Sequence, residues 1–378
     1  MLKTSTLKPF ARGDIFLGCT YLNHPTDDHQ GEGRILQFDR DWRPKGTLYT
    51  TGTRYLIVGC RIGPDGVLWG FDCHDHIAVR VNPDGTQQEP WDSGRSFGSV
   101  NWDAGGRLYF GEYFVGREIW KGTSARRLPD GTLGDGNLYR YSPDLELQRV
   151  FEVENAPETS GFKGVTHATL HPSGEFVTYT TETARRLMRY DIRAGRQLPD
   201  LAAYADADPL DRSDRRWFIA PHYLADGRLL CTDATGLAVY DEQGTMRQHI
   251  PLPGYGWAQV CPDVDERYAL AANVWTGTAA RIDLHEERLL ESIDVGFTAP
   301  FRSLAGLELD PALPAQWQSE LVALAALETE EQEFRRTEYE LAMERVQRFE
   351  TVQETWERRA KAGRSEEHTS ELQSQFRI

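Results

Sequence analysis

The chain has few cysteines, and their spacing does not suggest a disulfide framework or a thiolate metal site. There are five in 378 residues, an odd number, and no two are spaced as CxxC. Disulfide-rich extracellular domains and zinc-thiolate sites both depend on paired or closely spaced cysteines. The composition therefore favours reduced thiols and a cytoplasmic protein. The cysteines are Cys19, Cys60, Cys73, Cys231 and Cys261.

Long apolar runs and an excess of positive charge are also missing. No segment approaches the roughly 20 apolar residues of a membrane-spanning helix, and the first residues, MLKTSTLKPFARGD, lack the apolar core of a secretory signal. The formal net charge is -16, whereas nucleic acids and anionic membranes bind basic surfaces. We therefore expect neither as a partner. Nucleophile-elbow, phosphate-loop and dinucleotide-binding motifs are absent as well.

The chain does contain a repeated unit of short strands separated by Gly/Asp turns. Its clearest copy begins at Asp226, DGRLLCTDATGLAVYDEQGTMRQHI, and consists of strand, turn, strand, turn and strand. Repeats of this length and kind are typical of β-propellers. Further copies begin at Gly13, Asp65, Gly105, Ser173 and Asp265.

Six copies predict an all-β fold, a six-bladed β-propeller over residues 1–312. In each blade the innermost strand is expected just before the Asp/Gly turn, but the first copy has no such strand before Gly13. Residues 301–310 (FRSLAGLELD) follow the sixth copy and have no successor. We expect this C-terminal strand to complete the first blade, because closure by both ends of the chain removes an exposed sheet edge.

The composition changes after the predicted propeller. Residues 313–363 are rich in Glu, Arg, Ala and Leu, which favour a long α-helical extension. Two interpretations remain open: helices packed along the ring, or a coiled-coil arm that makes a homo-oligomer. The run RSEEHTSELQS within residues 364–378 resembles a translated sequencing adapter. We interpret residues 364–378 as an artefact and leave them out of the fold.

Two insertions interrupt the repeats, at residues 19–33 and 113–136. Both fall between the second and third strands of a blade. In a propeller those turns lie on the same face as the loops that enter the innermost strands. Long loops on one face of a rigid scaffold are often functional, so we expect the binding site on this face, at the mouth of the central funnel.

Histidines and acidic residues gather on the expected face. Imidazoles and carboxylates around a funnel suit zinc, and carboxylates with Asn suit calcium. The HxH in FDCHDH is a candidate chelating pair, because alternate residues of an extended segment share a face. The same residue types also stabilise tight turns, and this alternative stays open.

We assign three candidate roles to these residues. The candidate metal ligands are His74, His76, His167 and His222. The candidate catalytic residues are His167, His222 and Glu112. The candidate ligand-binding residues are His24, His29, Asp72, Glu182, Asp233 and Asn273.

The repeats HPSGEFVTYTTETARRLMRYDIRAG and ADGRLLCTDATGLAVYDEQG resemble the six-bladed propellers of the gluconolactonase, senescence-marker-protein, strictosidine-synthase-like and NHL-repeat group. The resemblance covers about residues 13–310 and concerns architecture. Calcium-dependent lactonases of the group carry an Asn in N-G-[LI]-A-x-S-P-D-G, where this chain has THATLHPSG with Thr166 and His167 in place of Asn and Gly. The lactonase metal motif is therefore not matched.

Two functions remain open at this point. One is a small-molecule hydrolase or lyase, acting on a lactone or ester, whose divalent metal in the central funnel lowers the pKa of bound water or polarises a carbonyl. The other is a non-catalytic propeller that binds a small molecule or a protein, with the helical extension as an assembly arm. The fold alone does not decide between them.

Overall fold

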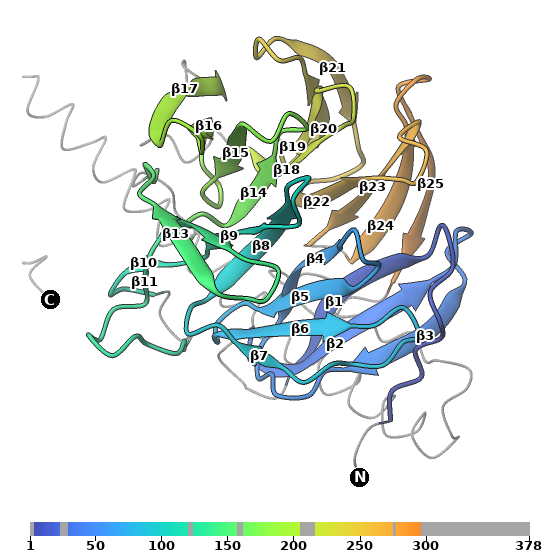
Figure 1. The fold of residues 1–378 in the computed structure, drawn as a ribbon. Coiled ribbons are helices and arrows are strands. Elements are labelled where there is room, and N and C mark those ends of the chain that lie inside the picture. Colours follow the sequence, from blue (N-terminus) through green and yellow to red (C-terminus); the bar gives the residue numbers. More distant parts are fainter. Residues whose placement is uncertain are drawn as a thin grey trace, which may run out of the picture. The chain divides into compact units, whose positions relative to one another are not determined.

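The computed structural model describes residues 4–22, 29–119, 124–156, 162–204, 216–274 and 277–295. Six main antiparallel sheets are set around a common centre, and each is one blade of a propeller (Figure 1). This confirms the predicted six-bladed β-propeller. The expected closing strand at 301–310 and the helical extension at 313–363 lie outside the described residues and stay predictions. No helix of the described residues is long and apolar enough to cross a membrane.

Blades 1 to 3 occupy the first part of the chain. Blade 1 consists of β1 (Ile15–Leu22), β2 (Gly31–Phe38) and β3 (Pro44–Tyr49). Blade 2 consists of β4 (Ile57–Ile62), β5 (Leu68–Asp72), β6 (Ile77–Val81) and β7 (Trp91–Asp92). Blade 3 consists of β8 (Phe97–Trp102), β9 (Leu108–Glu112), β12 (Leu138–Tyr141) and β13 (Leu147–Phe151). Its insertion forms a small hairpin of β10 (Val115–Gly116) and β11 (Gly134–Asp135).

Blades 4 to 6 follow the same order. Blade 4 consists of β14 (His167–Leu170), β15 (Phe176–Thr180), β16 (Arg186–Asp191) and β17 (Arg196–Ala203). Blade 5 consists of β18 (Ile219–Tyr223), β19 (Leu229–Thr232), β20 (Gly236–Tyr240) and β21 (Met246–Pro251). Blade 6 consists of β22 (Trp257–Pro262), β23 (Tyr268–Asn273), β24 (Thr278–Asp283) and β25 (Arg288–Asp294).

The inner strands β4, β8, β14, β18 and β22 lie nearest the common centre (Figure 1). Each runs from the face that bears the turns between second and third strands, here called the upper face, to the opposite or lower face. The lower face carries the Asp/Gly turns that mark the repeat. In one of them Asp241 accepts hydrogen bonds from the amides of Gln243 and Thr245, and Gly244 has a φ of 80°. The turn chemistry of Asp and Gly therefore explains the repeat.

The hydrophobic core lies between neighbouring blades. Between blades 2 and 3, for example, Phe71 packs edge-on against Phe110, which stacks on Phe97 with 4.8 Å between ring centroids. The described strands of blade 1 also pack against blade 6, because Ile15 and Leu36 share a buried cluster with Leu270. Contacts between the first and last blades close the ring, and closure removes edges that a linear stack would expose.

Several inner strands bulge at one point. The pairing register shifts between Val58 and Arg61 in β4, between Ile219 and His222 in β18, and between Trp257 and Gln259 in β22. A bulge bends a strand and re-aims the side chain that follows it. Arg61, His222 and Gln259, which directly follow these shifts, are the polar side chains that we place in the central channel below.

Two residues inside these bulges have left-handed backbone. Gly59 has a φ of 63° and Ala220 a φ of 51°. A Cβ on Gly59 would lie 2.3 Å from the carbonyl oxygen of Gly98 on the neighbouring inner strand. Glycine is therefore needed at position 59 both for its conformation and for the close approach of two blades.

We expect Gly59→Ala to lower the free energy of unfolding by more than about 3 kcal/mol, because it adds a backbone clash to a left-handed conformation. The matched control is Gly94→Ala, since Gly94 has a φ of 71° but no atom within 4 Å of the added Cβ. The control should cost only about 1 kcal/mol. Denaturant unfolding of both variants checks this, and equal losses would show that the contact between β4 and β8 is not tight.

Candidate functional site

A guanidinium group crosses the centre of the ring. Arg61 on β4 lies with Nη2 3.0 Å from Nε2 of His222 on β18. These strands belong to blades 2 and 5, which stand opposite each other in a ring of six. Propellers enclose a central channel, so this contact spans it. Arg61 and His222 keep partial exposure to solvent.

Asn101 on β8 fixes the orientation of this guanidinium. Nη1 of Arg61 donates to Oδ1 of Asn101 and, at 3.3 Å, to the carbonyl oxygen of Val100. Asn101 is itself held by blade 4, because it donates to the Ala168 carbonyl at 3.1 Å and accepts from the Leu170 amide at 3.0 Å. Four blades thus contribute to the placement of one charge.

The charge of Arg61 has no acidic partner in the described part of the chain. Desolvation lowers the pKa of its guanidinium to about 10, and no ion pair to Arg61 is formed by the described residues. Buried charges in proteins are normally paired. A desolvated cation whose described neighbours are a neutral amide, an imidazole and a thiol favours an anion beside it.

Cys261 on β22 shows that this space admits solvent. Its side chain is exposed, yet desolvation raises the pKa of the thiol to about 11, with Arg61 lowering it in part. Cys261 follows Gln259 by two residues on β22, so the two side chains lie on the same face of this inner strand. Cys261 and Arg61 therefore face the same channel.

The two channel histidines are neutral at pH 7. Burial lowers the pKa of His167 to about 4. Burial, followed by the nearby Arg61 charge, lowers the pKa of His222 well below its usual value. Nε2 of His167 lies 3.4 Å from the amide nitrogen of Gln259, and Nδ1 lies 3.0 Å from the Thr166 hydroxyl.

The two histidines do not lie at the same end of the channel. His167 is the first residue of β14, at the upper face, as predicted. His222 is the fourth residue of β18 and pairs with Leu230 close to the lower turn. The prediction placed both imidazoles at the upper ends of inner strands. It was wrong for His222, because the bulge after Ile219 lengthens this strand by residues that the repeat pattern does not reveal.

The four histidines predicted as metal ligands do not converge. Among the described residues, no group of three or more His, Cys, Asp or Glu side chains could hold a metal ion. Residues 73–76 form a turn, not an extended segment, so His74 and His76 do not form a chelating pair. The ring of His74 is fully buried and stacks on His29 with 4.7 Å between centroids.

Two of the predicted carboxylates hold loops of the upper face. Asp72 is fully buried, and it accepts hydrogen bonds from the amides of Arg54 at 2.7 Å and Tyr55 at 3.1 Å. Desolvation raises its pKa to about 6. Glu112 accepts from the amides of Asp135 and Gly136 at 2.7 and 2.8 Å.

A guanidinium also contacts Glu112, since Nη1 of Arg95 lies 2.8 Å from its Oε1. Burial raises the pKa of Glu112, while Arg95 opposes the shift. Both oxygens are thus engaged in fastening the insertion of blade 3. The structure gives Glu112 an anchoring role and places it away from the channel network of Arg61, Asn101 and His222.

The other predicted ligand-binding residues form hydrogen bonds with neighbouring loops or strands of the protein. Glu182 accepts from the Phe162 amide at 2.8 Å. Asp233 lies 2.7 Å from Nε2 of His249, and Asn273 donates to the Tyr255 carbonyl at 3.0 Å. His24 lies outside the described residues.

Sequence reasoning missed Arg61, Asn101 and Gln259. A usable signal was present, because each is a polar side chain in the middle or second half of an inner strand whose other residues are mostly apolar or small. The search for histidines and acids passed over them.

We expect the stability of the protein to fall below pH 6.5 because of the buried histidines. The folded-state pKa of His167, about 4, lies below the value of about 6.5 for an unfolded chain. The unfolded state therefore binds a proton first, and at pH 5 this site should cost up to about 2 kcal/mol.

Unfolding of His167→Gln measured between pH 7 and pH 5 checks this, and the variant should lose correspondingly less stability than the wild type. The control is His285→Gln, which replaces an exposed imidazole with 79% of its side chain accessible. If wild type and His167→Gln show the same pH dependence, His167 is not buried as a neutral group.

Comparisons with known proteins agree with the fold. No family model matches the chain, and no curated protein matches it.

The solved structure of a nidogen/laminin complex shares 14% identity over 74% of this chain and 93% of that chain, with a TM-score of 0.51. A gluconolactonase from Xanthomonas campestris shares 14% identity over 71% of this chain and 84% of that chain, with a TM-score of 0.48. Virginiamycin B lyase from Staphylococcus aureus shares 12% identity over 75% and 89%, with a TM-score of 0.46. At this level of identity the likeness concerns the propeller architecture, and the expected resemblance in architecture is confirmed.

Proposed function

We propose that this protein binds a small anionic molecule, one that carries a carboxylate or a similar oxyanion, in the central channel. The observation that carries the proposal is Arg61. Its guanidinium is desolvated, spans the channel to His222, and forms no ion pair among the described residues. A bound carboxylate would restore the pairing that a buried arginine normally has, and it matches the planar fork of the guanidinium.

The described side chains around Arg61 are neutral, so they do not weaken its preference for an anion. Arginine only donates, so a ring nitrogen of His222 accepts from Nη2 of Arg61, which lies 3.0 Å from Nε2 and 3.4 Å from Nδ1. Likewise the amide of Gln259 donates to Nε2 of His167. Among the described residues, the polar neighbours of Arg61 are therefore neutral acceptors and donors around its positive charge, which suits one negatively charged group.

A test needs no known ligand, because Cys261 is a reporter inside the channel. We expect Cys261 to react faster with an anionic methanethiosulfonate (sulfonate-bearing) than with a cationic one (trimethylammonium-bearing), relative to a free thiol. In Arg61→Gln the anion-to-cation rate ratio should fall about tenfold or more, since tenfold corresponds to about 1.4 kcal/mol.

Peptide mass spectrometry assigns the reaction to Cys261. The ratio of the two reaction rates does not depend on the fraction of Cys261 that is thiolate, because both reagents react with the thiolate. The control is Arg247→Gln, which removes a positive charge already paired with Asp241 at 2.6 Å on the exterior. A ratio that is unchanged in Arg61→Gln would contradict the proposal.

A second candidate, hydrolysis of a lactone or ester in the same channel, is favoured by the contact between Arg61 and His222. When the carbonyl oxygen of a substrate accepts the N–H of Arg61 instead, the ring nitrogen of His222 that had accepted it is released and can take a proton from the attacking water. A fixed guanidinium stabilises the negative charge that develops on the carbonyl oxygen. The product would be a carboxylate, the group that Arg61 is proposed to bind. The metal-dependent form of this activity has no ligand set among the described residues.

This second candidate makes a separate prediction. With short-chain nitrophenyl esters and γ-lactones as substrates, His222→Gln should lose hydrolysis by at least about 100-fold while it keeps the anion preference at Cys261. Arg61→Gln should lose both. If the wild type hydrolyses none of these compounds but shows the anion preference, the protein is a binding propeller and the hydrolase hypothesis fails.

A further inference from the structure

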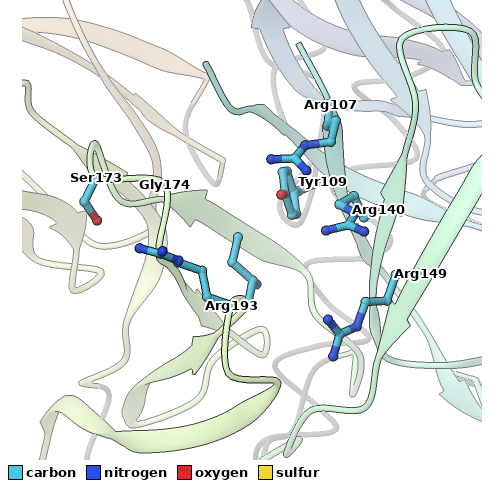
Figure 2. Close-up of a pocket in the computed structure, with 8 residues that line it drawn as sticks. Arg107, Tyr109, Arg140, Arg149, Ser173, Gly174 and Arg193 are labelled. Atoms are coloured by element: carbon cyan, nitrogen blue, oxygen red, sulfur yellow. The ribbon is translucent and has the colours of Figure 1, made fainter. Parts of the chain in front are cut away.

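A second positively charged site, lined by other residues than the channel, lies at the lower face where blades 3 and 4 meet. It is a cleft with a volume of about 430 Å³. Figure 2 shows Arg107, Tyr109, Arg140 and Arg149 on one wall, with Arg193 and Ser173 on the other. Four arginines in one cleft are unexpected in a chain whose formal net charge is -16.

Only two of the four arginines are neutralised. Arg107 pairs with Asp103, with 2.7 Å between Nε and Oδ2, and Arg193 pairs with Glu175. Arg140 and Arg149 form no ion pair with any described residue. The described part of the cleft therefore carries an excess of two positive charges.

The backbone forces these two charges together. Arg140 on β12 and Arg149 on β13 are direct cross-strand partners. Like charges directly opposite each other on neighbouring strands destabilise a sheet. An anion between the two guanidinium groups would remove this repulsion.

Phe151 contacts both side chains; Arg140 is half-buried and Arg149 is exposed. Both guanidinium groups lie over the ring of Phe151, at 4.7 Å for Arg149 and 6.0 Å for Arg140. Nε of Arg140 is buried and has no hydrogen-bond partner among the described residues. A buried donor without an acceptor is costly in a folded protein, and here it belongs to the group that faces the cleft.

We propose that this cleft binds the doubly charged phosphate group of a small molecule. Arg140 and Arg149 supply two charges and forked N–H donors, the arrangement that recognises phosphate oxygens in two-point contacts. Two positive charges match a dianion and would leave a charge uncompensated with a single carboxylate. The Tyr109 hydroxyl in the wall donates to Asp103, and the Ser173 hydroxyl lies 2.8 Å from Nδ1 of His171, so the two arginines supply the donors for the phosphate. The inference is independent of the function proposed for the central channel.

The experiment measures ligand-induced stabilisation with two probes, inorganic phosphate and glycerol phosphate, at constant ionic strength against chloride. It uses the full chain with Arg61→Gln, so that the central channel does not contribute. We expect a saturable rise in the unfolding temperature with each probe. In the double variant Arg140→Gln/Arg149→Gln the dissociation constant should rise at least about tenfold, or the shift should vanish.

The control removes the same charge elsewhere on the lower face. Arg228→Gln/Arg247→Gln deletes two arginines of blade 5 that have their own carboxylates, Asp226 and Asp241, and it should keep the full response. Tighter binding of glycerol phosphate supports a phosphomonoester ligand. Equal or tighter binding of inorganic phosphate supports phosphate itself as the recognised group. No saturable shift with either probe, or equal loss in both double variants, would overturn the proposal.

Discussion

The guanidinium group of Arg61 lies in the middle of the ring of blades, where water solvates its charge poorly. Desolvation lowers the pKa of its guanidinium to about 10, and the group stays in place through Asn101 and His222 on other blades. These hydrogen bonds join blade 2 to blades 3 and 5, and Asn101 continues the network to blade 4. The described polar groups of the channel are therefore arranged around the charge of Arg61, and those that contact it are neutral groups that accept its N–H bonds.

The strand bulges connect this charge to the fold. A register shift precedes Arg61, His222 and Gln259 in three inner strands. Each shift turns a polar side chain toward the channel without interrupting the sheet behind it. Left-handed backbone at Ala220, a residue with a side chain, is a local strain, and such strain is typical of positions that serve a site rather than stability. Contacts between blades 1 and 6 close the ring and so hold these inner strands around the channel.

The upper face has a different role from the one its composition indicates. Asp72 and Glu112 accept backbone amide hydrogen bonds, and the ring of His74 packs among aromatic rings. These residues fasten loops around the mouth of the channel. The formal net charge of the chain is -16, so the positive charges of Arg61, Arg140 and Arg149 contrast with the net negative charge of the protein.

The fold could be predicted from the sequence because its signal is local. Asp and Gly in each turn bond their own backbone, and the turns recur with the blades, so the repeats near Asp65 and Asp226 were sufficient. The site could not be predicted in the same way. Bulges such as that between Ile219 and His222 leave no clear sequence signal, and the HxH of residues 73–76 belongs to a turn. Which side chains face the channel depends on contacts between strands that are far apart in the chain.

We propose that the charge of Arg61 is paired by an anion from outside the chain. The most direct measurement is a crystal structure determined with bromide in the solution, at a wavelength where bromide scatters anomalously. The account predicts an anomalous peak in the central channel within contact distance of the Arg61 guanidinium, and its loss in Arg61→Gln. A carboxylate of the chain itself at that position, with no bromide peak, would contradict the account.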